Sequence, residues 1–241
     1  MDMMLIWAAL TALGAGILRG TVGFGSAMIL VPVLSALYNP LQAVTYVLVM
    51  DCLVSLPLIP AAAKRASFRS IALLTLFALV GTIPGFYLLK SLDEETVRFI
   101  VSSVAVLFSL IFLASGVLHR AGFRISEWLS GFQSGLFGGL GALTGPPVVL
   151  HFMLKGTDAH GIRANLIMYF LVIDVVLAAI ALSSLEQILE LILPLSVMLG
   201  AILAGAIIGQ KIAFRGDMPW YKPVAVGVIT FTAISSLFLP V

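Results

Sequence analysis

Three charged side chains lie within long apolar stretches of the sequence. Asp51 follows the residues YVLVM, Asp174 follows YFLVI, and Arg19 precedes a glycine-rich segment. An ionised group in a lipid environment is costly and marks a candidate functional site. The two aspartates could carry protons, or they could be fixed partners of Arg19 or caps for free helix N–H groups. Arg19 could bind an anion, pair with either aspartate, or extend to the lipid headgroups.

Each aspartate has a polar counterpart on the opposite face of its expected helix. At 100° per residue, Asp51 lies roughly opposite Gln42 and Tyr46, and Asp174 lies roughly opposite Asn165 and Tyr169. Either face of each helix could therefore line a pathway for a solute.

Two glycine-rich segments suggest a second kind of chemistry. The residues RGTVGFGS (19–26) and GGLGALTGPP (138–147) each interrupt a longer apolar stretch. A helix that begins at such a break presents free N–H groups and a partial positive charge, which suit an oxyanion. Glycine also lets the backbone approach a ligand closely. The alternative interpretation is that these glycines only allow tight packing between helices.

The sequence thus predicts an anion site where the two breaks meet. The candidate anion-binding residues are Arg19, Gly20, Thr21, Gly23, Gly25, Ser26, Gly138, Gly139, Thr144, Gly145 and Pro146.

Other types of active site find little support in the sequence. His119, His151 and His160 lack metal-ligand spacing, and Cys52 is the single cysteine. Neither a hydrolase nucleophile motif nor a phosphate-binding loop is evident. We therefore expect no enzyme activity, no cofactor and no bound metal.

The composition predicts an all-α polytopic membrane protein. Hydrophobic residues make up 61% of the 241 residues, charged residues make up 10%, and the mean hydropathy is +1.17. A soluble domain carries about a quarter charged residues, so lipid must cover this chain. The basic residues are scattered through short loops, which argues against a nucleic-acid partner. The stretches long enough to span a bilayer are 41–62, 70–90, 97–117, 163–183, 188–212 and 220–240.

Two further apolar regions are expected to be broken rather than continuous. Residues 4–38 and 128–155 each contain one glycine-rich break. Each region then leaves two arms of roughly 10–16 residues, at about 1.5 Å rise per residue. We expect each region to be a pair of short helices, which is either re-entrant or crosses the membrane twice.

The two halves of the chain share an ordered series of motifs. YVLVMD (46–51) matches YFLVID (169–174), and GTIPG (81–85) matches GAIIG (205–209). Upstream, the alignment places Gly16, Gly20, Gly23 and Pro32 on Gly131, Gly135, Gly138 and Pro147. The sequence predicts one transmembrane domain of two repeats, residues 1–118 and 126–241, each with a broken pair and three spans. The broken pair enters and leaves on the same side of the membrane, and the three spans add an odd number of crossings. The second repeat would therefore be inverted, as in many transporters.

The charges predict how the chain is oriented in a cytoplasmic membrane. One side of the expected topology collects ten basic residues, and the other collects only Lys90 and Arg98. The richer side should be cytoplasmic, with both termini outside. Asp2 stands where a cleaved signal would carry Lys or Arg, so the first helix should be retained. The ten residues are Lys64, Arg65, Arg69, Arg120, Arg124, Lys155, Arg163, Lys211, Arg215 and Lys222.

The two broken regions resemble the TauE/SafE sulfite exporter family, also called TSUP. The resemblance rests on GTVGFGSAMILVPVL (20–34) and GFQSGLFGGLGALTGPPVVL (131–150) and extends over nearly the whole chain. It implies a secondary transporter of sulfite, organosulfonates or related sulfur oxyanions. The positions it singles out are Gly20, Gly23, Gly25, Pro32, Gly135, Gly138, Gly139, Gly145 and Pro146.

Two other functional classes stay open at this point. The same breaks could form an anion channel, or the chain could be a membrane-embedded subunit without transport activity. The expected partners are a small anion, protons at Asp51 and Asp174, and the lipid bilayer. An inside-negative potential drives an anion outward by about 2.3 kcal/mol per charge per 100 mV, so uptake would need a coupled cation.

Overall fold

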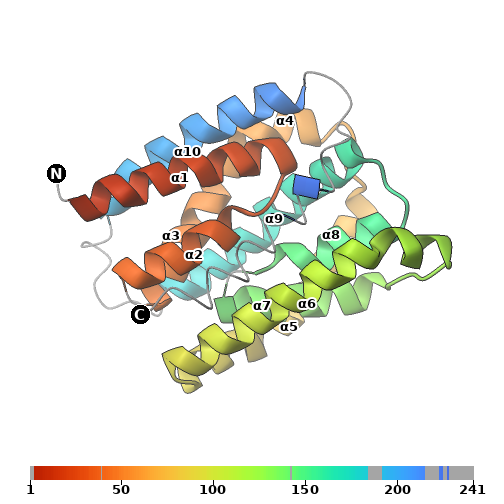
Figure 1. Ribbon diagram of the computed structural model, residues 1–241, viewed down its shortest axis with the longest axis horizontal. Coiled ribbons are helices and arrows are strands. Elements are labelled where there is room, and N and C mark those ends of the chain that lie inside the picture. The colour runs from red at the N-terminus through yellow and green to blue at the C-terminus, as the bar shows by residue number, and fades with distance from the viewer. Residues whose placement is uncertain are drawn as a thin grey trace.

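The described part of the chain is helical and contains no strand. The computed structural model describes residues 3–38, 40–141, 143–183, 192–214, 223–224 and 227 (Figure 1). In chain order, the helices are α1 (Met3–Val22), α2 (Ser26–Leu37), α3 (Pro40–Ser55), the short 3-10 helix η1 (Leu56–Leu58), α4 (Ile59–Ala62), α5 (Phe68–Ser91), α6 (Glu94–Arg120), α7 (Glu127–Gly141), α8 (Gly145–Leu154), α9 (Ala159–Leu182) and α10 (Ile192–Ala213).

Several helices have the length and composition of membrane spans. Within the described residues, the apolar segments that could cross a bilayer are Met3–Val22, Gln42–Ala62, Phe68–Ser91, Ala159–Ile180 and Pro194–Ala213. Four of them confirm predicted spans, and the 27-residue helix α6 covers the predicted span 97–117. The predicted span 220–240 lies almost wholly outside the described residues. The chain is therefore an all-α polytopic membrane protein.

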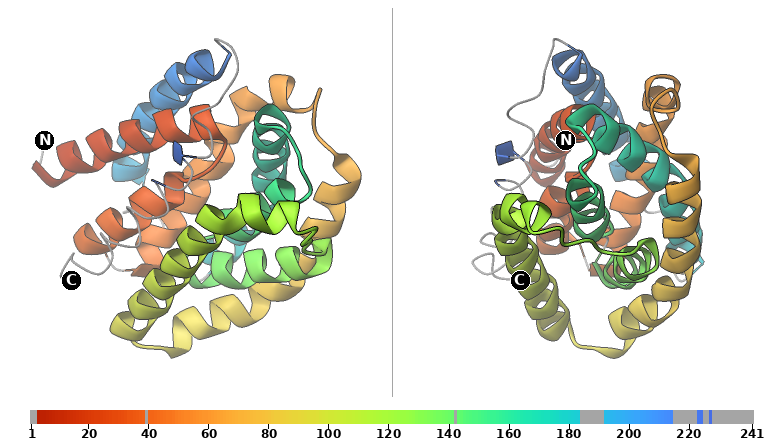
Figure 2. Two further views of the ribbon diagram at one scale, coloured as in Figure 1. Left: turned by 45° about the vertical axis from the view of Figure 1, so that its right-hand side comes forward. Right: turned by 90° about the vertical axis from the view of Figure 1, so that its right-hand side faces the viewer.

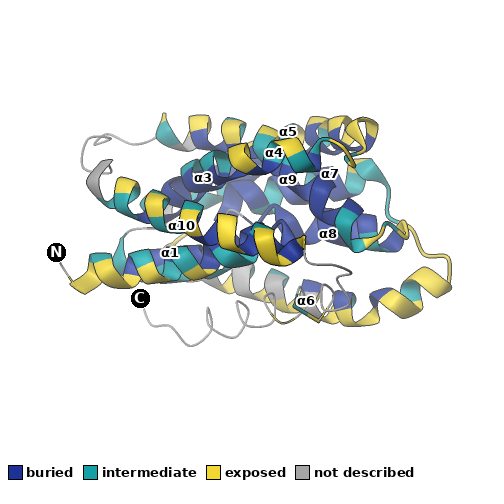
Figure 3. Cartoon of the chain, turned by 90° about the horizontal axis from the view of Figure 1, so that it is seen from above, coloured by how far each residue is buried: buried dark blue, intermediate teal, exposed yellow. Residues whose placement is uncertain are grey.

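Large apolar side chains on the outer helices face away from the protein. Ile83 on α5 is 73% exposed, and Leu110, Leu113 and Val117 on α6 are each more than half exposed. Figure 3 shows such exposed positions along the outer sides of α5 and α6, whereas α3, α8 and α9 are mainly buried. Exposed surface of this kind needs a lipid environment.

The first break lies later in the chain than its sequence suggests. α1 has 20 residues, so it is longer than the predicted arm, and Arg19, Gly20 and Thr21 belong to its last turn. Gly20 lies within this helix and packs closely on the backbone of α10. The break itself is short, and Gly23 and Gly25 adopt φ angles of 90° and 96°. Only glycine adopts this conformation without strain, so these two residues end α1 and reverse the chain into α2.

The other three arms are short, as predicted. α2, α7 and α8 have 12, 15 and 10 residues. The second break places Pro146 in the first turn of α8. Backbone N–H groups in this turn have no partner within the helix, so the N–H that proline lacks costs the helix no hydrogen bond. The two broken pairs enter from opposite ends of the molecule. In Figure 1, α1 starts and α2 ends on the left, whereas α7 starts and α8 ends on the right.

Close glycine contacts join α1 to α10. A Cβ added at Gly16 or Gly20 would collide with the carbonyl oxygen of Ile202 or Ala206 in α10. In return, Gly205 and Gly209 lie directly on the backbone of α1. The two helices run side by side in both Figure 1 and Figure 2. Small residues spaced four apart allow this close approach of two helix backbones.

The same arrangement joins α5 to α7. Gly81 and Gly85 of α5 lie on the carbonyl oxygens of Phe132 and Leu136, and Gly135 of α7 lies on that of Ala78. Gly139 likewise contacts the backbone of α5. The packing interpretation of the glycines therefore holds for Gly20 and Gly139, both of which the sequence nominated as anion-binding residues.

The glycine contacts of the two helix pairs follow the same spacing. Gly205 lies on Leu13, and Gly81 lies on Phe132, so the offset between α1 and α7 is 132 − 13 = 119. The sequence alignment of Gly16 with Gly131 has an offset of 115, which differs from the contact offset by four residues. The four-residue glycine spacing fits both offsets, because sliding it by four still aligns glycine with glycine. The packing offset also matches Ser26 with Gly145, the first residues of α2 and α8.

Candidate functional site

The two breaks meet inside the protein. Residues 21–28 and 143–152 are all buried. A Cβ added at Gly145 would lie 3.2 Å from Phe24 Cδ2 in the first break and 3.5 Å from Phe170 Cζ on α9. The N-terminal ends of α2 and α8 are thus held in one region of the interior, as the sequence predicts.

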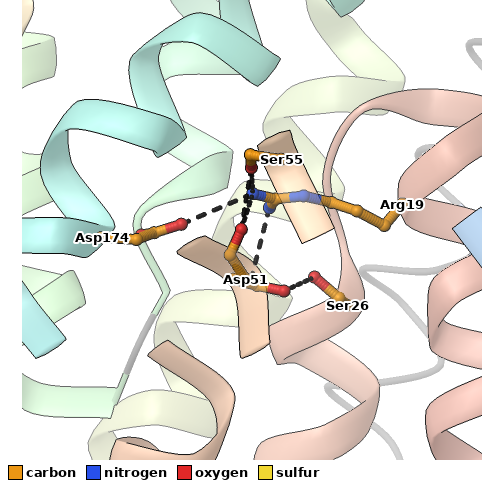
Figure 4. A network of polar contacts seen from close by, with 5 residues as sticks. All are labelled: Arg19, Ser26, Asp51, Ser55 and Asp174. Carbon is orange, nitrogen blue, oxygen red and sulfur yellow. Dashed lines mark hydrogen bonds and ion pairs between the residues drawn. The ribbon is translucent and has the colours of Figure 1, made fainter. Parts of the chain in front are cut away.

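Arg19 lies between the two predicted aspartates (Figure 4). Its Nη1 is 3.3 Å from Asp51 Oδ2, and its Nη2 is 3.4 Å from Asp174 Oδ2. The guanidinium is 1% exposed, so it does not extend to the headgroups. Pairing with both aspartates, which the sequence left as one of three possibilities, is what the structure shows for Arg19.

Two serines complete this cluster. Ser26, the first residue of α2, donates a hydrogen bond of 2.5 Å to Asp51 Oδ1. Ser55 accepts a hydrogen bond of 3.0 Å from Arg19 Nη2 and donates one of 2.8 Å to the Asp51 carbonyl. The cluster therefore ties the end of α1 and the start of α2 to α3 and α9. We call Arg19, Ser26, Asp51, Ser55 and Asp174 the Arg19 cluster.

Ser55 and one further neighbour of Arg19 were not predicted from the sequence. The ring of Phe170 lies 4.3 Å from Arg19 Cζ, within the range of a cation–π interaction. Ser55 follows Asp51 by four residues, and Phe170 precedes Asp174 by four. A search for residues one helical turn from each aspartate would have found both.

The formal charges of the Arg19 cluster do not cancel. One guanidinium and two ionised carboxylates sum to 1 − 2 = −1, and all three side chains are buried. A buried net charge is strongly unfavourable. A proton on one carboxyl would make the cluster neutral, and a second proton would make it +1. The charge of the Arg19 cluster therefore depends on how many protons its two carboxyls hold.

The second break has its own hydrogen bonds. Ser134 of α7 donates a hydrogen bond of 2.6 Å to the Thr144 carbonyl, and its Oγ lies 2.7 Å from the Tyr169 hydroxyl. Gly138 packs against the methyl group of Thr144, and Pro146 is buried. Asp174 faces the first break and Tyr169 faces the second, so both faces of α9 contact a break.

Three predicted site residues lie at helix contacts rather than in the cluster. The hydroxyl of Thr21 donates to the Ile17 carbonyl within α1. Gly20 and Gly139 face α10 and α5, as described above. Gly23 packs against Arg163, while Gly25 directly precedes Ser26.

Arg163 is placed differently from its prediction. The sequence predicts it to be one of the basic residues on the cytoplasmic side, but it lies in α9 and is 5% exposed. Its Nε and Nη2 donate hydrogen bonds of 3.1 and 2.7 Å to the Gly20 carbonyl. This carbonyl is in the last turn of α1, where no further helical N–H is available. Arg163 therefore fixes the end of α1, next to Arg19.

The histidines lie apart from the Arg19 cluster. His119 lies in the last turn of α6 with its Nδ1 3.0 Å from the Leu154 carbonyl, and His160 lies in the first turn of α9. The described residues contain no group of three His, Cys, Asp or Glu side chains placed to hold a metal ion.

Comparison with known proteins identifies the family. The family model described as sulfite exporter TauE/SafE matches residues 8–236, nearly the whole chain. Searches of curated proteins and of solved structures gave no match. The match agrees with the helical membrane fold. The chain belongs to the TauE/SafE sulfite exporter family of membrane transporters.

Proposed function

We propose that this chain is a secondary transporter that moves a small sulfur oxyanion, such as sulfite or an organosulfonate, across the cytoplasmic membrane. The anion would bind near the midplane, where the two breaks meet. The observation that carries this proposal is the position of Arg19, buried beside the start of α2 and paired with Asp51 and Asp174. Arginine matches the geometry of an oxyanion, and the free N–H groups at two helix starts add partial positive charge.

Proton coupling follows from the charge of the Arg19 cluster. An incoming anion must compete with two carboxylates for one guanidinium. When Asp51 and Asp174 both bind protons, Arg19 is left with an uncompensated positive charge that a monoanion can neutralise. Protonation then favours anion binding, and anion binding favours protonation, because linkage is reciprocal. The transported species is an anion accompanied by protons.

The proposed architecture is a pair of inverted repeats, residues 1–118 and 126–241, with both termini outside. Its support is the opposite entry of the two broken pairs and the matching glycine contacts of α1 with α10 and α7 with α5. The close contact between Phe24, Gly145 and Phe170 fills the space between the breaks. This closure favours a carrier that rearranges over an open anion channel.

A flux and binding screen tests the proposed function. Purified protein in liposomes would be assayed with sulfite, sulfate, thiosulfate and methanesulfonate, and its thermal stability would be measured with each anion. We expect saturable flux of at least one sulfur oxyanion, together with stabilisation by that anion. Arg19→Gln should reduce the flux more than tenfold, by removal of a charge-assisted contact.

Arg120→Gln is the matched control, since Arg120 is an exposed cation at the end of α6. It should leave flux and binding unchanged. If none of the anions binds or moves, or if both variants lose flux equally, the proposed function is wrong.

A further inference from the structure

A separate pocket with several charged and polar lining residues lies at the end of the molecule where α7 begins and α8 ends. It has a volume of about 330 Å³. The lining residues are Arg124, Ile125, Ser126, Glu127, His151 and Lys155. None of these residues belongs to the Arg19 cluster, and the proposed transport step does not use them. We call this cavity the His151 pocket.

His151 presents an unused hydrogen-bond acceptor to this pocket. Its Nδ1 lies 2.9 Å from the Ile125 carbonyl, which can only accept, so Nδ1 carries the hydrogen. In the neutral ring, Nε2 then has a free lone pair. The side chain is 4% exposed, and Nε2 has no hydrogen-bond partner among the described residues. A buried polar atom of this kind is uncommon and points to a ligand.

The group nearest to Nε2 is itself an acceptor. Glu127 Oε1 lies 3.7 Å away, beyond hydrogen-bond distance. Glu127 Oε1 already accepts a hydrogen bond from Lys155 Nζ, so Nε2 is the acceptor that is left without a hydrogen. The imidazole thus favours a ligand with an O–H group.

The rest of the pocket favours an anion. Arg124 is exposed, and Lys155 Nζ lies 3.3 Å from Glu127 Oε1 and 3.0 Å from Ser70 Oγ. With Glu127 ionised and His151 neutral, the formal charge of the lining is 2 − 1 = +1. The start of α7 adds free N–H groups and a partial positive charge next to Ser126.

We propose that the His151 pocket is a second binding site for a small oxyanion that carries a proton, such as hydrogen sulfite. Arg124 and Lys155 contact the negatively charged oxygens, and the ligand O–H donates to His151 Nε2. The sulfur chemistry of the ligand rests on the proposed function. The pocket lies at the end of the molecule richest in basic residues, where it can concentrate the anion before transport.

Nuclear magnetic resonance of the histidine side chains tests this site without a transport assay. The chain has three histidines, so the His151 signal can be assigned by its absence in His151→Asn. The full-length protein in detergent would be titrated at fixed, slightly acidic pH with hydrogen sulfite and with methanesulfonate, which has no O–H. We expect the His151 signal to shift saturably with hydrogen sulfite, and about tenfold more weakly with methanesulfonate.

Two variants separate ligand contact from folding. Asparagine at position 151 places an amide N–H near the former Nδ1, so His151→Asn should keep the bond to Ile125 and its thermal midpoint. It should weaken hydrogen sulfite binding, measured by calorimetry, about tenfold by removing Nε2. Arg124→Gln should weaken the His151 response about tenfold, and Arg120→Gln should leave it unchanged.

The outcomes distinguish this inference from the proposed function. Normal sulfite flux with no His151 response would overturn the second site alone. A saturable His151 response in a protein that moves no anion would overturn the proposed function and leave the second site. An equal loss of response in Arg124→Gln and Arg120→Gln would show only general electrostatic attraction, which also overturns the site.

Discussion

At the scale of single residues, the Arg19 cluster combines one cation with two carboxylates. The guanidinium contacts Asp51, Asp174 and Ser55, while Ser26 holds the second oxygen of Asp51. Because the carboxylates outnumber the cation, the three charged positions should respond differently to substitution. Different effects of substitution at the three positions would distinguish an ion pair that only stabilises the fold from a cluster that binds and releases protons.

Arg19→Met should destabilise the protein far more than Asp51→Asn. Methionine leaves two buried carboxyls without a cation, and breaking such a buried pair costs about 3–5 kcal/mol. Asparagine leaves Arg19 paired with Asp174 and retains an oxygen that accepts from Ser26. The thermal unfolding midpoint of each purified variant in detergent checks this. Equal loss in both variants would mean that the cluster does not carry excess negative charge.

Asp174→Asn should uncouple sulfite movement from proton movement. The substitution removes one proton-binding group while keeping a similar shape beside Arg19. A pH-sensitive dye inside liposomes would report the protons that accompany each sulfite. The ratio should fall in Asp174→Asn relative to the unmodified protein. An unchanged ratio would assign Asp174 a fixed structural role, which the sequence also allowed.

The sequence identified the ionisable members of this site but not its neutral ones. Asp51, Asp174 and Arg19 are conspicuous because charge is rare in apolar stretches. Ser55 and Phe170 are common residue types in such stretches, and only their distance of one turn from an aspartate distinguishes them. Arg163 was misplaced because it lies close to a polar loop, and its burial depends on the carbonyl of Gly20, more than a hundred residues away.

At the scale of elements, four glycine-bearing helices form two close pairs. α1 packs on α10, and α5 packs on α7, each through glycines four residues apart. In the sequence, these glycines are compatible with both anion binding and helix packing. Sequence spacing could not decide between them, because the same four-residue repeat serves either purpose. The backbone contacts assign Gly20 and Gly139 to packing and leave Gly25 and Gly145 at the breaks.

Gly16→Ala should destabilise the protein, whereas Gly14→Ala on the same helix should not. A Cβ at Gly16 would collide with the Ile202 carbonyl, while a Cβ at Gly14 has no atom within 4 Å. Overpacking typically costs about 1–3 kcal/mol, and alanine in an open helical position gains up to about 1 kcal/mol. Thermal midpoints of the two variants provide the comparison. If Gly16→Ala were as stable as Gly14→Ala, the close α1–α10 contact would be wrong.

At the scale of the whole molecule, the charged loops gather at one end. The connections at 63–67, 121–126 and 155–158 lie on the right in Figure 1, opposite the N-terminus. Lys64, Arg65, Arg124 and Lys155 belong to this end. Arg163 no longer counts among its surface charges, and Arg215 and Lys222 lie outside the described residues. The remaining excess still predicts that this end faces the cytoplasm.

Cysteine labelling tests that orientation. In a Cys52→Ala background, Phe123→Cys and Glu95→Cys would place one thiol near each end of α6, at exposed positions. A membrane-impermeant maleimide should label Glu95→Cys in intact cells and Phe123→Cys only after permeabilisation. The reverse pattern would place the termini inside and invert the proposed topology.

The central claim is that the meeting point of the two breaks carries a sulfur oxyanion by a carrier mechanism. Its most direct test is counterflow of radiolabelled sulfite into liposomes that contain the purified protein and excess unlabelled sulfite. We expect a transient accumulation of label with the unmodified protein and with Arg120→Gln, and none with Arg19→Gln. Label entry that never exceeds equilibrium would indicate a channel, and accumulation that persists in Arg19→Gln would contradict the proposed site.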